Sequence, residues 1–283
     1  MGAAMRGVAL DKPLGDRLAG FLQDALLEYQ VLTFPDQSLT PGRVLELARL
    51  FGKPEVHPIH AGMSGSPEII RLDKRQGEAD PVGERARTIA SHFVRPSKVV
   101  LCYCDDVSAN CDFLFSSLTR AWEGLSPPVQ EFLRDLRAIH SGENEFAPPN
   151  RDPGSFMGRS SSPLVYSDAI YACIEHPLVH THPDTGKTSL YVNEAFTRSI
   201  CGLSEGESNA LLEFLVRHTA LPEYGCRIPS EPGTLTIWDN RVTTQRSTWY
   251  PNHQSRRFYL VAVASGEELA LSADWPISAG MTN

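Results

Sequence analysis

The chain has 283 residues, of which 41% are hydrophobic and 21% charged, so it is long enough for one large globular domain with a sizeable core. Its formal net charge of −8 argues against a nucleic-acid partner, which would require basic clusters. No segment approaches the roughly 20 apolar residues of a membrane-spanning helix, and six cysteines are too few for a disulfide scaffold, so we expect a cytoplasmic protein with no membrane partner.

The N-terminal part should form two helices around a strand. Apolar residues recur at helical spacing over residues 16–29, and residues 31–34 are typical of a strand. Thr40 is a suitable N-cap for a second helix with Pro41 at its first position, and Gly52 lies beyond its end.

The middle of the chain begins with a segment of different character. Residues 73–97 are charged and rich in glycine and alanine, which predicts a long loop. Strand-like runs follow at residues 99–103 and 113–115, and helices should begin near Thr119 and at Ser126.

The last part combines strands with one clear helix. Ser204 and Glu207 form a capping box, so a helix should run from there to about His218. A long loop is predicted at residues 142–165. Two strands that flank a turn are predicted at 178–181 and 189–192, and two buried strands at 233–238 and 257–264. Short strands with interspersed helices and no β-α-β order indicate a single α+β domain over residues 1–283, mainly β and built on a β-sandwich.

Two sequence blocks resemble one known family. The segment His176–Asn193 (HPLVHTHPDTGKTSLYVN) and the motif Trp238–Arg241 (WDNR) resemble the TauD/TfdA, or taurine/2,4-D dioxygenase, family of Fe(II)/2-oxoglutarate-dependent oxygenases. Weaker matches, including the pair Arg256–Arg257, extend the resemblance over about residues 5–267. The resemblance implies a double-stranded β-helix, or jelly roll, with surrounding helices. It also implies an iron site made by His-x-Asp and a distal His, which leaves open positions for 2-oxoglutarate and oxygen.

The sequence departs from the family at all three iron-ligand positions. The resemblance places these positions at Ala86, Thr88 and Gln245. The spacing between Pro96 and Ser126 matches the family without a gap, although the register of residues 75–95 stays open. We therefore predict that the iron triad is lost and that the chain uses neither a metal nor another cofactor.

The co-substrate and substrate pockets are altered as well. Arg257 matches the arginine that holds the 2-oxoglutarate tail in the family, whereas Phe113 replaces the threonine that assists it and Val261 replaces a substrate-binding arginine. His57 matches a histidine that contacts substrate, and His60 takes the place of an aromatic pocket residue. The residues that we expect to line the pocket are Phe113, Trp238, Gln245, Arg246 and Val261.

These observations lead to three hypotheses of function. The first is a metal- and 2-oxoglutarate-independent, non-redox enzyme of specialised metabolism, such as a cyclase, isomerase or lyase. Its catalytic candidates are His57, His60, His92 and Arg257. The second is an Fe(II)/2-oxoglutarate-dependent dioxygenase with atypical ligands such as His92 and His253, in which Arg257 binds 2-oxoglutarate. The third is a non-catalytic pseudoenzyme subunit or ligand-binding protein.

Simpler structural roles compete with the functional ones. Arg257 could pair with a surface carboxylate, His57 could be a hydrogen-bonded loop residue, and Trp238 could serve the core. We expect the partner to be a small-molecule substrate or ligand, and the resemblance implies a homodimer or homotetramer.

Overall fold

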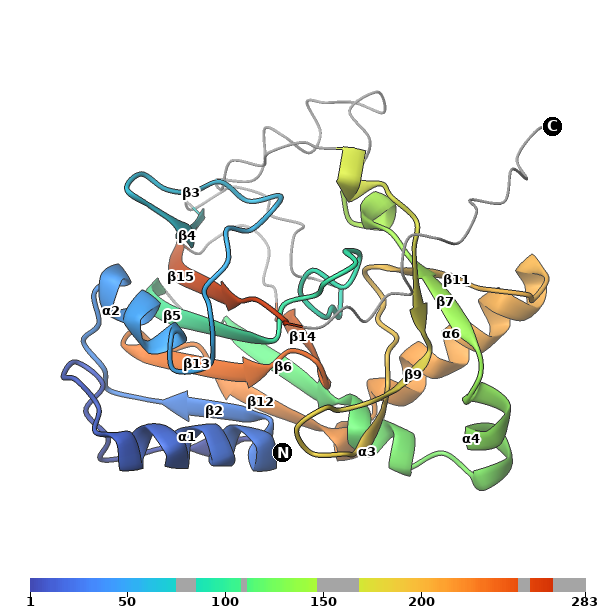
Figure 1. Cartoon of the computed structure of the whole chain (residues 1–283), viewed down its shortest axis with the longest axis horizontal. Coiled ribbons are helices and arrows are strands. Elements are labelled where there is room, and N and C mark those ends of the chain that lie inside the picture. The colour runs from blue at the N-terminus through green and yellow to red at the C-terminus, as the bar shows by residue number, and fades with distance from the viewer. Residues whose placement is uncertain (75–84, 108–110, 147–167, 249–254, 267–283) are drawn as a thin grey trace.

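The computed structural model describes residues 1–74, 85–107, 111–146, 168–248 and 255–266 (Figure 1). Two sheets form its centre. The larger has seven strands in the order β1-β2-β13-β5-β15-β4-β3. The bounds of these strands, in that order, are Ala3–Ala4, Val31–Phe34, Thr234–Asp239, Val99–Val107, Arg256–Val263, Ser66–Lys74 and Gly62–Met63. All neighbours are antiparallel except β1 and β2.

The smaller sheet faces the larger one and closes the jelly roll. Its order is β12 (Gly225–Pro229), β6 (Asp112–Ser117) and β14 (Thr243–Ser247), all antiparallel. Side chains from both sheets form one buried cluster between them, which includes Phe113 and Phe115 from β6, and Trp238 and Phe258 from the larger sheet. We call this cluster, with its neighbours, the interior of the roll.

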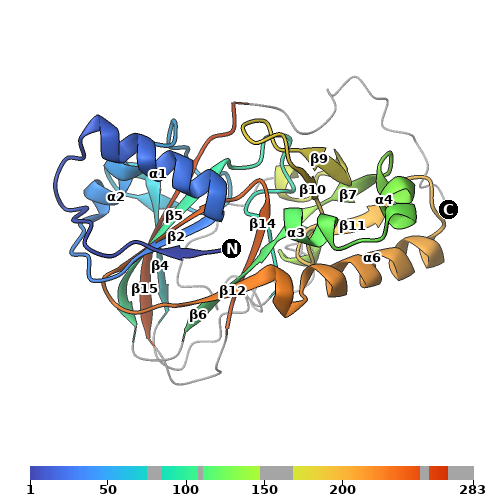
Figure 2. The same cartoon turned by 90° about the horizontal axis from the view of Figure 1, so that it is seen from below.

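Helices α1 (Asp16–Tyr29) and α2 (Pro41–Ala48) cover the other face of the larger sheet (Figure 2). Leu22 and Leu26 of α1 are buried against strand residues such as Leu235 and Ile237. Because strand side chains alternate between faces, each residue of β13 or β15 contributes either to this helix-covered core or to the interior.

The rest of the molecule is a second packed region beside the sheets. It contains α3 (Leu118–Glu123), α4 (Pro127–Leu133) and α6 (Glu205–Thr219), with the short sheets β11-β7-β8 and β10-β9. The strands β7, β8, β9, β10 and β11 are Arg137–His140, Ile174–Pro177, Val179–Thr181, Thr188–Leu190 and Thr197–Ile200. The described part of this region also contains 3-10 turns at Gly142–Asn144, Asp168–Ile170 and Pro222–Tyr224. Leu118, Leu133, Leu190 and Leu215 form its buried apolar core.

The jelly-roll fold predicted from the sequence is confirmed, and so are most of the elements. The first helix has the predicted bounds, and α6 begins with the predicted capping box, in which the Ser204 hydroxyl accepts from the Glu207 backbone. The predicted loop over 73–97 begins inside β4, and residues 75–84 lie outside the described part. The described strands that were not predicted are β1, β3, β4, β7, β8, β11, β12 and β14. No helix in the described ranges has the length and apolar character that crossing a membrane requires.

Candidate functional site

The segment in which the sequence resemblance places two of the iron-ligand positions, Ala86 and Thr88, lies along the edge of β14. Arg87 and Gln245 exchange both backbone hydrogen bonds, at 2.9 and 2.8 Å. Asn240, in the turn after β13, fixes the same segment: its Oδ1 accepts from the Ile89 N–H at 2.8 Å, and its Nδ2 donates to the carbonyls of Ile89 and Ser97. The Asn of the WDNR motif therefore positions this segment through its side-chain amide.

The three positions do not converge on one point. Directly opposed residues of an antiparallel pair share a face, so Arg87 and Gln245 share one, with Phe115 next to them on β6. Ala86 instead lines a cavity on the other face of the smaller sheet. Thr88 is buried and its hydroxyl donates to the Thr243 carbonyl at 2.9 Å.

The side chains at these positions do not fit an Fe(II) ion. An alanine has no ligand atom, and a threonine and a glutamine are not the imidazole and carboxylate ligands that this ion takes in two-histidine, one-carboxylate sites. Within the described ranges, no group of three or more His, Cys, Asp or Glu residues is arranged to hold a metal. His253, an alternative ligand considered from the sequence, lies outside these ranges.

A buried ion pair lies beside Gln245. The Arg87 guanidinium is 2.7 Å from Glu145 Oε1, and the two side chains are only 6% and 4% exposed. The same guanidinium also donates to the Arg85 carbonyl at 3.3 Å. Taking two charges out of water is costly unless they compensate each other, so each of these residues depends on the other for its burial.

His57, His60 and His92 are electrostatic neighbours in the structure. The His57 Nδ1 accepts from the backbone N–H groups of Ile59 and His60, at 3.2 Å each, and its ring lies 4.9 Å from that of His60. Burial, then the nearby His60 and His92, lowers the pKa of His57 well below its usual range. His57 is therefore a neutral imidazole at pH 7, with Nδ1 as an acceptor.

His92 is the most unusual of the three. Its ring is 1% exposed and lies 4.2 Å from the Phe93 ring and 4.3 Å from the Phe196 ring, the latter in a stacked arrangement. Neither ring nitrogen has a hydrogen-bond partner in the described part of the chain. Burial, followed by His176 and Arg87, lowers the pKa of His92 to about 3. The side chain is therefore neutral, with a donor and an acceptor that are both unused.

The structure places Arg257 away from the interior. Its guanidinium pairs with Asp73 at 2.9 Å and with Asp105 at 3.4 Å, and it is 39% exposed. The alternation of β15 explains this, because Phe258 is in the interior cluster and Tyr259 in the helix-covered core. Arg257 is two residues from Tyr259, so its side chain lies on the same face of β15 as Tyr259 and not on the interior face. There it pairs with surface carboxylates, which is the simpler role suggested by the sequence.

Arg256 has the opposite parity, and sequence reasoning missed it. Its Nη1 is 3.4 Å from the sulfur of Cys111, and its guanidinium lies 6.0 Å from the ring centroid of Phe258; both residues belong to the interior cluster. The alternation of strand side chains could have revealed it, because Arg256 is two residues from Phe258 and therefore lies on the same face. Arg87 was missed too, because the family match directs attention to its two neighbours.

The pocket-lining residues proposed from the sequence fall into three places. Phe113 and Trp238 are in the interior cluster. Gln245 lies directly opposite Phe115, which belongs to that cluster, so its side chain is on the interior face of β14. Val261 packs in the helix-covered core, because it is an odd number of residues from Phe258. Arg246 lies on the outer face of β14.

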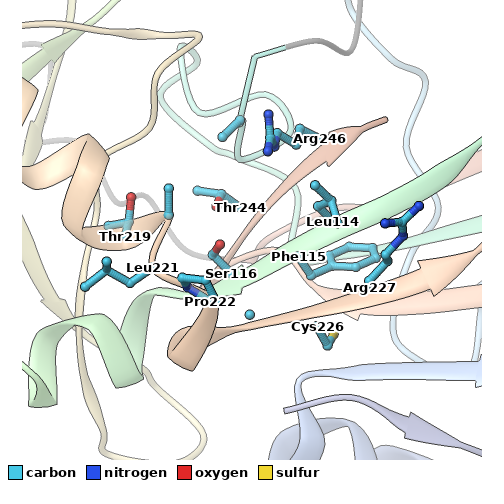
Figure 3. Close-up of a pocket in the computed structure, with 13 residues that line it drawn as sticks. Leu114, Phe115, Ser116, Thr219, Leu221, Pro222, Cys226, Arg227, Thr244 and Arg246 are labelled. Atoms are coloured by element: carbon cyan, nitrogen blue, oxygen red, sulfur yellow. The ribbon is translucent and has the colours of Figure 1, made fainter. Parts of the chain in front are cut away.

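That outer face borders a cavity of about 310 Å³ (Figure 3). Strands β6, β12 and β14 form one side, and the end of α6 with the following turn forms the other. Polar lining residues include Ser116, Thr219, Thr244 and Arg246. This cavity was not foreseen, because β12 and β14 were not predicted as strands.

The histidines of the His176–Asn193 block serve the fold. The Nδ1 of His182 accepts from the N–H groups of Asp184 and Thr185, so its Nε2 carries the proton and donates to Asp239 at 2.9 Å. Arg241 donates to both Asp239 oxygens, at 2.9 and 2.6 Å. Burial alone would raise the pKa of Asp239, but these hydrogen bonds from Arg241 and His182 outweigh it and hold the value at about 2. The Asp and Arg of WDNR thus tie the β9–β10 hairpin to β13.

Comparison with known proteins shows which family the chain resembles over its length. The model of the family described as "Taurine catabolism dioxygenase TauD, TfdA family" matches residues 1–263. An alkylsulfatase of Acinetobacter baylyi is 30% identical over 86% of this chain and 75% of its own length. An alpha-ketoglutarate-dependent sulfate ester dioxygenase of Pseudomonas putida is 28% identical over 86% of this chain and 79% of its own.

A solved structure agrees with these relatives. The crystal structure of a putative alpha-ketoglutarate-dependent taurine dioxygenase from Burkholderia xenovorans superposes with a TM-score of 0.79 and 28% identity, over 97% of this chain and 89% of that one. Together these findings contradict the prediction of a metal- and 2-oxoglutarate-independent, non-redox enzyme, because the Pseudomonas and Burkholderia proteins are named as dioxygenases that depend on alpha-ketoglutarate. The prediction that no cofactor is used is wrong on the same grounds. Both errors came from giving the three ligand positions more weight than the rest of the chain.

Proposed function

Because the chain belongs to the TauD, TfdA family of dioxygenases, we propose that it is an alpha-ketoglutarate-dependent dioxygenase of a small organic substrate. The observation that carries the proposal is a family match that extends over residues 1–263, together with the same fold in a relative of that description. When bound, the family's metal would activate molecular oxygen, which is the oxidant, and 2-oxoglutarate would supply two electrons as it is converted to succinate and carbon dioxide. The residues of this chain bind, orient and exclude water around them.

The proposal includes an unusual ligand set. Ala86, Thr88 and Gln245 do not supply the family triad, so a metal that binds this chain is held by other residues. Two features support this part: the side chains at the three positions do not suit the ion, and Ala86 lies on a different face from Gln245.

His57, His60 and His92 are the proposed substrate-side groups. Burial and their mutual proximity keep His57 and His92 neutral at pH 7, so each can donate or accept a hydrogen bond without bringing a charge. The two unused nitrogens of His92 lie among aromatic rings, where a hydrogen bond to a bound molecule would compensate for their burial. Arg87, on the face of Gln245, provides a cation whose charge Glu145 balances.

The same proposal extends to assembly and location. We place the protein in the cytoplasm as a homodimer or homotetramer. All six cysteines are free thiols, which suits a reducing compartment, and the oligomeric state follows the family resemblance.

The test of the function is a binding and turnover measurement on the whole chain. The apoprotein is titrated with 2-oxoglutarate in the presence and absence of Fe(II), and succinate formation is followed under air with a panel of sulfate esters, sulfonates and carboxylic acids. We expect one equivalent of 2-oxoglutarate to bind in a metal-dependent manner. A protein that binds neither metal nor 2-oxoglutarate would refute the proposal.

The ligand set is tested by a second comparison. If Gln245 is not a ligand, Gln245→Ala should leave the Fe(II) affinity unchanged, whereas loss of metal binding in this variant would assign the distal position to Gln245 after all. His92→Phe preserves the aromatic volume and should raise the KM for the best substrate. An unchanged KM and kcat would remove His92 from the site.

A further inference from the structure

The cavity beside β14 lies outside the interior of the roll. Thr244 is paired in register with Ser116, and Arg246 with Leu114, so these four side chains share one face of the smaller sheet. Gln245 and Phe115 share the opposite face, which contributes to the interior. One strand layer therefore separates the cavity from the candidate site, and the further inference does not rest on the proposed oxygenase function.

Three hydroxyl groups line the cavity and keep hydrogen-bonding capacity that the described part of the chain does not use. The Ser116 and Thr244 hydroxyls make no hydrogen bond to any residue that the structure describes, although Thr244 is almost fully buried. Thr219, across the cavity at the end of α6, donates its hydroxyl proton to the Val216 carbonyl and keeps its lone pairs. Figure 3 shows Ser116 and Thr244 on neighbouring strands with Thr219 facing them. These polar groups are available to a bound molecule.

The cavity also has an uncompensated positive charge. Arg227 and Arg246 both line it, but Arg227 pairs with Asp112. Arg246 is exposed and forms no ion pair with any residue in the described ranges. On a chain with a formal net charge of −8, an unpaired arginine next to free hydroxyls is a local exception that favours an anion.

The opposite end of the cavity has a different character. The C-terminus of α6 directs the negative end of its dipole here, which disfavours an anionic group at that side. Leu221 and Pro222 supply an apolar wall at the same end. A ligand that fits both ends has its charge near Arg246 and an apolar body near Leu221.

We propose that this cavity is a second ligand site, which binds a small organic monoanion with an apolar chain. Arg246 pairs with the carboxylate, sulfonate or sulfate group, the Ser116 and Thr244 hydroxyls donate to its oxygens, and Leu221 and Pro222 contact the chain. A volume of about 310 Å³ is at the lower end of the range for ligand pockets, so the ligand is small. Through β14, an occupied cavity lies next to the backbone that carries Gln245 and Arg87.

Hexanoate and hexanesulfonate are suitable probes, titrated by calorimetry against the whole chain in metal-free buffer without 2-oxoglutarate. We expect one site with a Kd of about 1 mM or tighter. Arg246→Gln should weaken binding at least about 10-fold, because it removes a charge-assisted hydrogen bond. Thr244→Val keeps the shape and removes one hydroxyl, so it should weaken binding several-fold.

Two control variants separate this site from the alternatives. Arg217→Gln removes the same charge from an exposed position on α6 that does not line the cavity, and it should leave the affinity unchanged. His57→Ala changes a residue of the candidate site that does not line the cavity, and it should also leave the affinity unchanged. Equal weakening by Arg246→Gln and Arg217→Gln would show nonspecific charge attraction and overturn the proposal, as would a loss of binding caused only by His57→Ala. Absence of any binding by wild-type protein would overturn it too, whatever the outcome of the 2-oxoglutarate titration.

Discussion

The Arg87–Glu145 ion pair offers the sharpest test of the energetics of the candidate site. Its charged atoms are 2.7 Å apart and both side chains are buried. Among the described residues, Arg87→Met leaves the Glu145 carboxylate without a counter-charge, and Glu145→Leu leaves the guanidinium with the Arg85 carbonyl as its remaining partner. Breaking a buried pair by removing one partner costs about 3–5 kcal/mol, so each single variant should lose that much of its free energy of unfolding.

The double variant distinguishes the ion pair from simple loss of packing. Replacing both charges with apolar side chains of similar volume is often neutral, because no unpaired charge stays buried. We therefore expect Arg87→Met/Glu145→Leu to be more stable than either single variant. Because each single variant should lose about 3–5 kcal/mol and the double variant less than either, the coupling free energy from the double-mutant cycle should exceed about 3 kcal/mol.

Urea unfolding at pH 7, followed by both circular dichroism and tryptophan fluorescence, measures these free energies. Coincident transitions from the two probes establish that linear extrapolation applies. Single variants that each lose less than about 1 kcal/mol would be typical of an exposed pair and would refute the reasoning. Additive losses in the double variant would equally show that the two charges do not depend on each other.

Three further predictions concern stability. Asp239→Asn should cost about 3 kcal/mol at pH 7, because Arg241 loses its buried partner. Since the folded pKa of Asp239, about 2, lies below its ordinary value, wild-type protein should lose this stabilisation as the pH falls from about 4 to 2, and the variant should not. His92 is a base whose folded pKa is about 3, so below pH 6.5 the unfolded chain binds a proton that the folded chain does not. The free energy of unfolding should therefore decrease as the pH is lowered from 6.5, by up to about 1.4 kcal/mol per pH unit. The decrease should be less steep in His92→Phe. Ser204→Ala should cost about 1 kcal/mol by removing the α6 cap, whereas Ser126→Ala, whose side chain makes no cap hydrogen bond, should be neutral in thermal unfolding.

The helices were predictable because their signals are local. The apolar spacing of residues 16–29 and the capping box at Ser204 depend only on neighbouring residues, and both gave the observed elements. Strand β14 has the sequence TTQRS, which contains no apolar residue to reveal the alternation. Its three buried residues owe that burial to β6 and to the 85–88 segment, which are distant in sequence. A strand of this kind is defined by tertiary pairing rather than by its own composition.

The same reason explains which site residues were found. Matching to a family assigns a role to each position but not a face, and the face depends on register. Arg257 matched the co-substrate arginine, yet it pairs with Asp73, while its neighbour Arg256 contacts Cys111 in the interior cluster. A shift of one residue along a strand exchanges the two, and the pairing of β15 with β4, in which Arg257 lies opposite Asp73, distinguishes them.

Strand β14 gives the two sites a physical connection. Gln245 faces the interior, and Thr244 and Arg246 face the outer cavity, so consecutive residues of one strand belong to different sites. No side chain of one site contacts the other site, but the side chains of both sites project from the same backbone. Arg87 holds this backbone through two hydrogen bonds to Gln245. An anion that binds Arg246 therefore affects the interior only by displacing this backbone. Because a paired strand resists displacement, the two sites should titrate independently unless the Arg87–Gln245 pairing opens when the cavity is filled.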